Sequence, residues 1–416
     1  MIDARWALGL FLCLTLPVIL TGSAGHDGLA YDAVTFHLPQ INYFLAHPGN
    51  LLNYPATATT LPLYHALMGV MGRLAGLTMV DNSTLVVRLV HFMISAAGLI
   101  LLTSRLRCRL DAPMALLLAL PLATCWYVIS GAVYFGTDGP ALTLVLIALL
   151  DWEKSRLPAQ ALLLLLVAGT RHLLLPFVGL LYGIRALAAR SPATLIAVGM
   201  AAMPAVLMLA IYIRQWGGLT PPGMVAALNP KGLFPYALLG HLGVAGMWGV
   251  GFGALRFPQW TAFLVERKIQ IALVALNILV LTLWAIVPTD PIPEAGRFGS
   301  ITWSLARVGL FGHHSVAVLI MAMAGATTLL LMALDLKAAG QLPSEIMALA
   351  GFLCALMLTY AAYQRYSEPM ILAVFTVASI KTCGRGKVSF GQALPLLGLC
   401  LLSIGVSLHH LLPIKG

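Results

Sequence analysis

The tract YDAVTFHLPQ, residues 31–40, combines an acid, a histidine and two aromatic residues shortly after the first apolar run of the chain. A carboxylate such as Asp32 can act as a general base that takes a proton from a hydroxyl group, and His37 can orient that carboxylate or the hydroxyl. Phe36 and Pro39 can anchor the following helix at a membrane surface. The tract therefore predicts a reactive group at the level of lipid head groups.

Further ionisable residues fall on the same predicted side of the chain. Charged side chains at membrane depth are costly and are functional candidates by default. We expect Asp32, Asp138 and His37 to be catalytic, with Asp32 as the base and Asp138 binding the acceptor or supporting Asp32. The residues expected to bind substrate are Asp27, which is also the reserve candidate for the base, Arg171, His172, Arg297, Arg365, Tyr366 and Glu368.

Each candidate also has a simpler explanation. A loop acid such as Asp27 or Asp290 is commonly just solvated. Asp138 starts a helix in YFGTDGPAL, where an acid caps the first turn and interacts favourably with the helix dipole. His37, before Pro39, could cap the following helix. The case for a site rests on the shared side and depth of these residues.

The composition indicates a polytopic membrane protein. Hydrophobic residues make up 60% of the chain, charged residues only 9%, and the mean hydropathy is +0.93, far from the values of soluble domains. The net charge of +10 comes from 24 Lys and Arg scattered over short loops, without the basic stripe that nucleic-acid binding requires. We therefore expect membrane lipids and anionic lipid phosphates as partners, and no nucleic acid.

Apolar runs predict an all-α bundle of about thirteen transmembrane helices in one domain, residues 1–416. The expected spans are 6–24, 84–104, 113–131, 139–152, 157–169, 173–187, 193–213, 236–254, 268–288, 314–334, 344–363, 368–382 and 391–411. The spans 157–169 and 173–187 are short, which indicates broken or tilted helices that meet at Thr170–His172 and line a cavity. The first run could also be a cleaved signal peptide, but a retained span suits a multi-span protein better.

Basic residues predict the orientation. Clusters such as Arg105, Arg107 and Arg109, or Lys381, Arg385 and Lys387, fall on loops of one parity and are expected in the cytoplasm. The opposite loops are expected in the periplasm of a bacterial inner-membrane protein: 25–83, 132–138, 214–235 and 289–313. Loop 25–83 is the large outer loop, in which residues 61–77 form an interfacial amphipathic helix.

No metal or cofactor motif is present in the sequence. The six cysteines show no CxxC pair and no histidine spacing typical of zinc, and we expect all six to be packing residues. No Gly-rich phosphate loop, repeat or Ser/His/Asp signature stands out. We therefore expect no cofactor, and a site built from loop residues near the interface.

The chemistry that suits one acid and several arginines at an interface is glycosyl transfer from a lipid-phosphate sugar. The carboxylate takes the proton of an acceptor hydroxyl as the oxygen attacks the anomeric carbon. Lipid phosphate is already a good leaving group, so a second, protonated acid is unnecessary. The departing phosphate needs cationic stabilisation, which the planar fork of arginine supplies.

Several tracts resemble the eukaryotic alpha-1,2-glucosyltransferase family that adds the last glucose to the dolichol-linked N-glycan precursor. YDAVTFHLPQ is similar to the acidic stretch and F-H-x-P-Q of its first luminal loop, and TTLPLYHALMG to its T-T-x-P-x-L-Y tract. YFGTDGPAL is similar to its Y-Y-T-D tract, TRHLLLPF to its R-Q-T-N segment, and QRYSEPM to its E-P-R-Y tract, with a different residue order. The matched residues are Phe36, His37, Pro39, Gln40, Thr59, Thr60, Pro62, Tyr64, Thr137, Asp138 and Arg171.

The chain departs from this family at two places. Asp32 stands alone where the family has two adjacent acids, and EAGRFGSITW replaces its L-A-D-N-R-H-Y tract. The resemblance therefore implies the broader GT-C superfamily: an all-helical inverting glycosyltransferase that uses a polyprenyl-phosphate sugar donor and a lipid-linked glycan or other acceptor. The alternatives are a transporter or flippase without transferase activity, which predicts internal symmetry and mid-membrane charges, and a non-catalytic assembly subunit.

Overall fold

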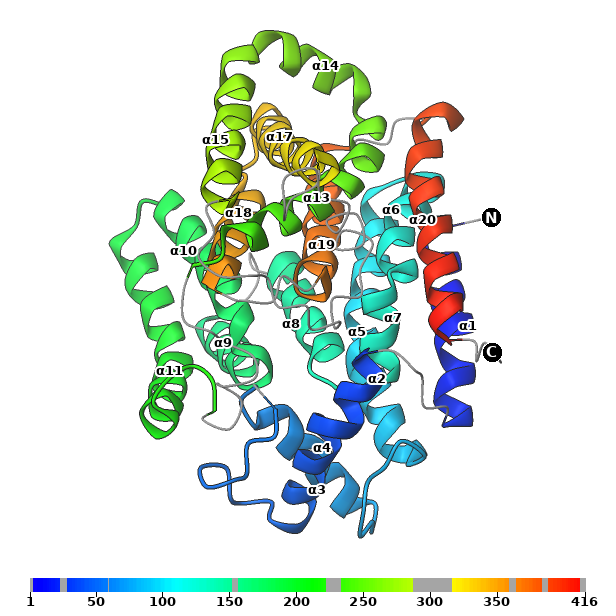
Figure 1. Ribbon diagram of the computed structural model, residues 1–416, viewed down its shortest axis with the longest axis vertical. Helices are drawn as coiled ribbons and strands as arrows, with labels where there is room; N and C mark the ends of the chain where they lie inside the picture. The colour runs from blue at the N-terminus through cyan, green and yellow to red at the C-terminus, as the bar shows by residue number, and fades with distance from the viewer. Residues whose placement is uncertain are drawn as a thin grey trace.

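The computed structural model describes residues 3–22, 28–58, 60–151, 156–221, 233–286, 316–358, 364–383 and 388–411. Within these ranges the chain forms helices and no strand, as the sequence predicted (Figure 1). The helices of the first half are α1 (Arg5–Thr21), α2 (Gly28–Asp32), the π-helical turn η1 (Ala33–His37), α3 (Leu38–Ala46), α4 (Leu63–Leu74), α5 (Leu85–Arg109), α6 (Ala112–Thr124), α7 (Trp126–Val133) and α8 (Asp138–Asp151). Those of the second half are α9 (Leu157–Arg171), the 3₁₀ turn η3 (His172–Leu174), α10 (Leu175–Ala188), α11 (Pro192–Trp216), α13 (Pro235–Leu255), α14 (Phe257–Glu266), α15 (Lys268–Ile286), α17 (Val316–Ala338), α18 (Ser344–Ala355), the 3₁₀ turn η4 (Leu356–Leu358), α19 (Gln364–Thr382) and α20 (Phe390–Leu411).

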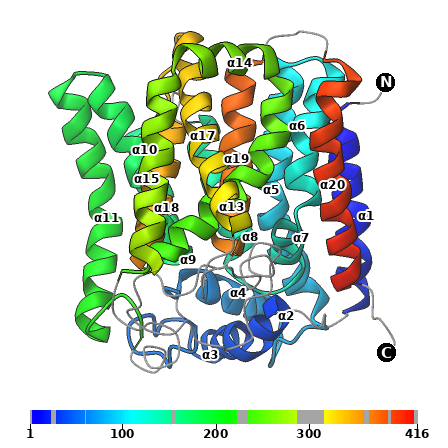
Figure 2. The ribbon, with the colours of Figure 1, turned by 45° about the horizontal axis from the view of Figure 1, so that its top comes forward.

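The long helices form a bundle, and several of them are apolar enough to cross a membrane. Six described segments are long and apolar enough to cross a bilayer, or up to seven if α6 and α7, bent by 61° at Cys125, are one span. By length and composition these are Leu85–Arg109, Leu157–Ala188 (α9, η3 and α10 counted together), Pro192–Trp216, Pro235–Leu255, Val316–Ala338 and Phe390–Leu411. Shorter apolar helices, such as α1, stand among them, with α20 beside α1 in both views (Figures 1 and 2). The total number of spans, about thirteen, stays a prediction.

The helices α9 and α10 meet at the turn η3 and the chain reverses there. Leu157, at the start of α9, lines the same surface pocket as Ala193, which follows shortly after the end of α10. Both outer ends of this hairpin therefore lie together, and the turn at Arg171–Leu174 lies at the other end of the bundle. This geometry agrees with the expectation of two short helices meeting at Thr170–His172.

The bundle has two distinct ends. The helices α2, α3 and α4 lie across one end, which we call the first-loop end, and α14 lies at the opposite, α14 end (Figure 2). Arg256, directly before α14, pairs with Asp335 near the end of α17, and Glu345 follows in the first turn of α18. Arg185 and Lys381 both contact Glu345, so these two basic residues lie at the α14 end. These described basic residues thus lie at the end opposite the long first loop, as the charge pattern predicted.

A continuous helical segment from residue 28 to 46 begins the first loop. It contains one π-helical turn, in which the N–H of Leu38 donates to the carbonyl of Ala33. Pro39 has no N–H with which to continue the ordinary helical pattern, and π turns inside helices are frequent at functional sites. The helix α4 packs closely on α3, because a Cβ on Gly69 would lie 2.7 Å from the backbone nitrogen of Leu45. With 12 residues, α4 is too short to span a bilayer, in keeping with the interfacial helix expected at 61–77.

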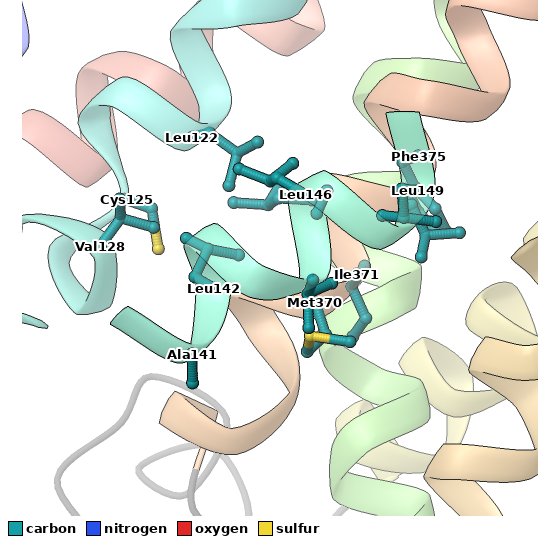
Figure 3. Close-up of a cluster of buried hydrophobic side chains, with 14 of the residues drawn as sticks. Leu122, Cys125, Val128, Ala141, Leu142, Leu146, Leu149, Met370, Ile371 and Phe375 are labelled. Carbon is teal, nitrogen blue, oxygen red and sulfur yellow. The ribbon is translucent and has the colours of Figure 1, made fainter. Parts of the chain in front are cut away.

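The apolar core fixes the helices that carry the ionisable residues. Side chains of α6, α8 and α19 interdigitate around Leu122, Leu146 and Phe375 (Figure 3). The closest helix pair is α13 and α17, where a Cβ on Gly246 would lie 2.0 Å from the carbonyl oxygen of Met321. Small residues of this kind let apolar helices approach without a hydrophobic driving force between them.

All six cysteines are free, and their burial differs from the expectation. Cys125, Cys383 and Cys400 are buried and pack in the core, whereas the other three are exposed on the helix surface. The prediction that all six are packing residues is therefore wrong for Cys13, Cys108 and Cys354. An apolar stretch of sequence does not show which face of its helix turns inward.

Candidate active site

The first element of the site is an ion pair between two distant parts of the chain. Asp32, the last residue of α2, accepts from Nη1 of Arg365, in the first turn of α19, at 2.5 Å. Each of the two side chains is 19% exposed. The pair joins the first loop to the C-terminal third of the bundle and leaves both groups within reach of a ligand.

A second ion pair lies next to the first. Arg171, at the end of α9, donates to Oδ1 of Asp138, the first residue of α8, and also contacts Oγ1 of Thr137 at 3.2 Å. The side chains of Arg171 and Asp138 are 12% and 17% exposed. Asp138 does occupy the first turn of a helix, where the dipole favours it, and it also takes part in the polar cluster.

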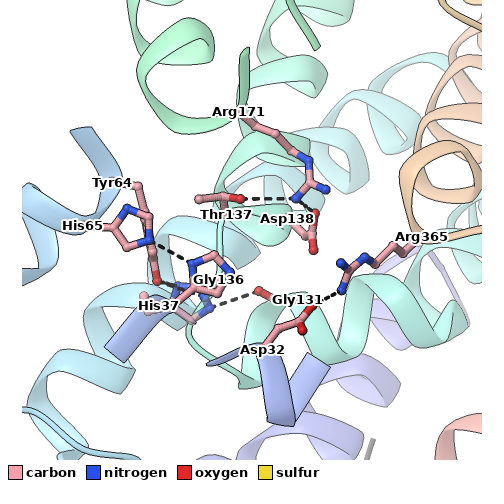
Figure 4. A network of polar contacts seen from close by, with 11 residues as sticks. Asp32, His37, Tyr64, His65, Gly131, Gly136, Thr137, Asp138, Arg171 and Arg365 are labelled. Atoms are coloured by element: carbon pink, nitrogen blue, oxygen red, sulfur yellow. Dashed lines mark hydrogen bonds and ion pairs between the residues drawn. The ribbon is translucent and has the colours of Figure 1, made fainter. Parts of the chain in front are cut away.

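Tyr366 connects the two ion pairs into one cluster. The guanidinium carbon of Arg171 lies 4.9 Å from the centroid of the Tyr366 ring, and that of Arg365 lies 5.4 Å from it. Both distances suit a cation–π contact. Figure 4 shows each arginine reaching its own carboxylate, with the two ion pairs next to each other. Four segments far apart in the sequence thus bring together two acids, two arginines and one phenol ring.

Four side chains on one side of this cluster, His37, Tyr64, His65 and His91, are here called the histidine wall. Nδ1 of His37 lies 2.8 Å from Nε2 of His65, and the hydroxyl of Tyr64 lies 2.9 Å from Nδ1 of His91. The backbone N–H of Gly136 donates to the Tyr64 hydroxyl at 3.2 Å (Figure 4). These bonds tie the first loop to the segment that leads into Asp138.

Close backbone contacts place Asp138 itself. A Cβ on Gly139 would lie 2.3 Å from the carbonyl oxygen of Gly131, so only glycine allows α7 and α8 to meet this tightly. That carbonyl also lies 3.0 Å from Nε2 of His91. The aspartate is therefore held by a rigid support, which a group that binds or reacts requires.

His37 and His65, which bond to each other, are neutral at ordinary pH. Burial lowers the pKa of His65 to about 3. Burial also lowers the pKa of His37 well below its usual value, with further contributions from His65, Arg171 and Arg365. One ring therefore donates and the other accepts in the His37–His65 bond. Neither residue adds positive charge to the cluster.

The structure brings together most of the predicted site residues. Asp32, Asp138, Arg171, Arg365 and Tyr366 meet in the cluster, and the ring of His37 faces Gly136, beside Asp138. The nearest atoms to a Cβ on Gly136 belong to that ring, at 3.7 Å. Asp27 and Arg297 lie outside the described residues.

Glu368 and His172 are not partners in the two ion pairs. Glu368 turns toward α13, where it accepts from Nε1 of Trp248 and from Nε2 of Gln364, each at 2.7 Å. His172 follows Arg171 in η3, and its buried Nδ1 has no hydrogen-bond partner among the described residues. The carboxylate of Glu368 thus stabilises the helix that carries Arg365.

Sequence reasoning did not assign a site role to Tyr64, His65, His91 or Thr137. His91 had a detectable signal, since a histidine inside an apolar span is a functional candidate. His65 lies in the predicted interfacial helix 61–77, which by itself gave no indication of a site. Within the described residues, no group of three or more acids, histidines or cysteines is placed to hold a metal ion.

The fold and the cluster define the chain as an all-helical protein with membrane-type helices and a polar site at one end of its bundle. It matches no family model, and it has no significant match among the curated proteins or the solved structures.

Proposed function

We propose that this chain is an inverting membrane glycosyltransferase of the GT-C type. It transfers a sugar from a polyprenyl-phosphate donor to a lipid-linked glycan or another hydroxyl acceptor. The observation that carries the proposal is the cluster of Asp32, Asp138, Arg171 and Arg365 at the first-loop end. A carboxylate beside two arginines is the set of groups that such a transfer requires.

The reaction assigns a role to each group. Asp32 accepts the proton of the acceptor hydroxyl while the oxygen attacks the anomeric carbon of the donor sugar. The bond between that carbon and the phosphate oxygen breaks, and its electron pair leaves with the polyprenyl phosphate. Attack from the face opposite the phosphate inverts the anomeric configuration. Arg365 and Arg171 stabilise the charge on the departing phosphate, and Asp138 positions the acceptor or Asp32.

The histidine wall orients these groups. His37 and His65 are neutral and hydrogen-bonded to each other, so His37 can position a hydroxyl without attracting the donor phosphate. Tyr64 and His91 hold the turn before Asp138. The wall thus supplies pre-organisation, which lowers the cost of reaching the reactive geometry.

Transfer in proteoliposomes tests the proposal. Purified protein is reconstituted with a panel of radiolabelled polyprenyl-phosphate sugars and extracted lipid acceptors. We expect the label to move to an acceptor, and the transfer to fail with Asp32→Asn. Label that crosses the bilayer without joining an acceptor, for every donor in the panel, would overturn the transferase in favour of a transporter or flippase.

We further propose that the first-loop end faces the periplasm of a bacterial inner membrane, with the basic α14 end in the cytoplasm. Gly49→Cys and Lys337→Cys place single thiols at exposed positions of the two ends in a Cys-free background. An impermeant thiol reagent applied to intact spheroplasts should label the Gly49→Cys protein and not the Lys337→Cys protein. The reverse pattern would overturn the orientation.

A further inference from the structure

Both arginines of the cluster are occupied by carboxylates in the structure. Arg365 bonds to Asp32 and Arg171 bonds to Asp138. Guanidinium groups bind carboxylate and phosphate through the same planar arrangement of N–H donors. A phosphate group entering the cluster would therefore compete with these carboxylates for the same donors.

The cluster is built in a way that permits such an exchange. The carboxylates of Asp32 and Asp138 are 19% and 17% exposed, so a ligand can reach the bonds. The ring of Tyr366 contacts both guanidinium groups independently of the carboxylates. When a carboxylate leaves, this cation–π contact still holds its arginine in place.

We propose that the phosphate group of the lipid donor exchanges with Asp32 on Arg365, so that donor binding itself frees the carboxylate that acts as the base. This inference rests on the proposed function and deepens it. While Asp32 accepts from Arg365, that carboxylate oxygen is engaged by the guanidinium and is not free to take the proton of the acceptor hydroxyl. The acceptor hydroxyl is therefore deprotonated only when a donor occupies the cluster, and donor binds before acceptor.

The charges balance through the reaction. The four side chains carry two positive and two negative charges, and a donor phosphodiester adds one negative charge. Proton transfer from the acceptor neutralises Asp32 as the leaving phosphate gains a second negative charge, since a phosphate monoester carries about −1.5 to −2. The proton on Asp32 thus compensates the charge that develops on the leaving group.

Equilibrium binding of farnesyl phosphate to the full-length protein in detergent tests the exchange without any transfer reaction. Asp32→Asn removes the competitor from Arg365, so we expect it to bind farnesyl phosphate about tenfold tighter, while Arg365→Gln binds about tenfold weaker, as for loss of a charge-assisted hydrogen bond. In the double variant, Asp32→Asn should add nothing to Arg365→Gln, because the exchange requires the arginine. Asp81→Asn removes an acid bonded to Ser83 and Thr84 elsewhere in the first loop, and it controls for the change in net charge.

The outcomes separate the exchange from the function on which it rests. If wild type and Asp32→Asn both fail to bind farnesyl phosphate, the phosphate site and the proposed function fail together. If wild type binds and Arg365→Gln weakens binding, but Asp32→Asn binds no tighter than Asp81→Asn, the exchange is wrong and the function stands. Equal tightening for inorganic phosphate would overturn the lipid donor as the trigger. Equal melting temperatures of the variants confirm that each is folded.

Discussion

Ion pairs lie at both ends of the bundle, but their surroundings differ. At the α14 end, Glu345 is fully buried and bonds to Arg185 at 2.6 Å and to Lys381, while Asp335 is 6% exposed and bonds to Arg256 through two contacts at 2.7 and 2.8 Å. At the first-loop end, the carboxylates of Asp32 and Asp138 are about three times as exposed as that of Asp335. The carboxylates of the pairs are thus buried at one end and partly exposed at the other.

This difference in exposure distinguishes ion pairs that hold helices together from ion pairs that a ligand can reach. A buried pair that loses one partner leaves an uncompensated charge, which costs far more than the intact pair contributes. An open pair exchanges partners more easily, since water or a ligand can solvate the released group. We infer that the pairs at the α14 end hold helices together, whereas those at the first-loop end are available for chemistry.

The largest expected effect is on activity at the first-loop end. Asp32→Asn keeps the size of the side chain and removes its charge, and loss of a general base costs about 10²–10⁴-fold in rate. Its stability should change little, because the amide can still accept from Arg365. Transfer assays and thermal unfolding in detergent measure the two quantities. If Asp32→Asn keeps near-normal transfer while Asp138→Asn abolishes it, Asp138 is the base instead.

The matching change at the α14 end should affect stability. Glu345→Gln leaves Arg185 and Lys381 without a neutralising charge, at a cost of about 3–5 kcal/mol in the free energy of unfolding. Transfer per folded molecule should remain at the wild-type level. Glu266→Gln, at an exposed position of α14, is the control that removes an equivalent charge. A Glu345→Gln protein as stable as this control would contradict the structural role of the ion pairs at the α14 end.

Replacing the arginines of the cluster should have a smaller effect, on donor use. Arg365→Lys and Arg171→Lys keep the charge but lose the planar fork, so transfer at limiting donor should fall about tenfold. Arg73→Lys, at an exposed position of α4, should leave transfer unchanged. Wild-type turnover in both cluster variants would place the phosphate site elsewhere.

The smallest effect concerns acid stability at the first-loop end. The pKa of His65 is about 3 in the folded protein, below its unfolded value of about 6.5. The unfolded state therefore binds more protons between these pH values, and stability must fall as the pH falls through this window. Between pH 7 and 5.5 the loss from this histidine is about 1 kcal/mol. Unfolding of wild type and His65→Gln at several pH values measures it, and identical pH profiles would contradict the burial effect.

The sequence alone determined the class of the fold and most of the charged residues that meet in the cluster. Apolar runs and the scarcity of charge predicted an all-helical membrane-type protein, and the scatter of basic residues separated its two ends. The acids and arginines of the cluster were identified because charge is costly near a membrane, whatever its partner. These are local properties, readable one segment at a time.

Only the tertiary structure decided which charges pair and which face each helix presents. Asp32 and Arg365 are 333 positions apart, and no local pattern joins them. At 100° per residue, Glu368 falls on the face of Gln364 and nearly opposite Tyr366, but the sequence does not say which face meets the site. The bonds of His37 to His65 and of Tyr64 to His91 likewise depend on how α4 packs against its neighbours. Pairing depends on three-dimensional distance, which packing of the helices sets and the order of residues does not reveal.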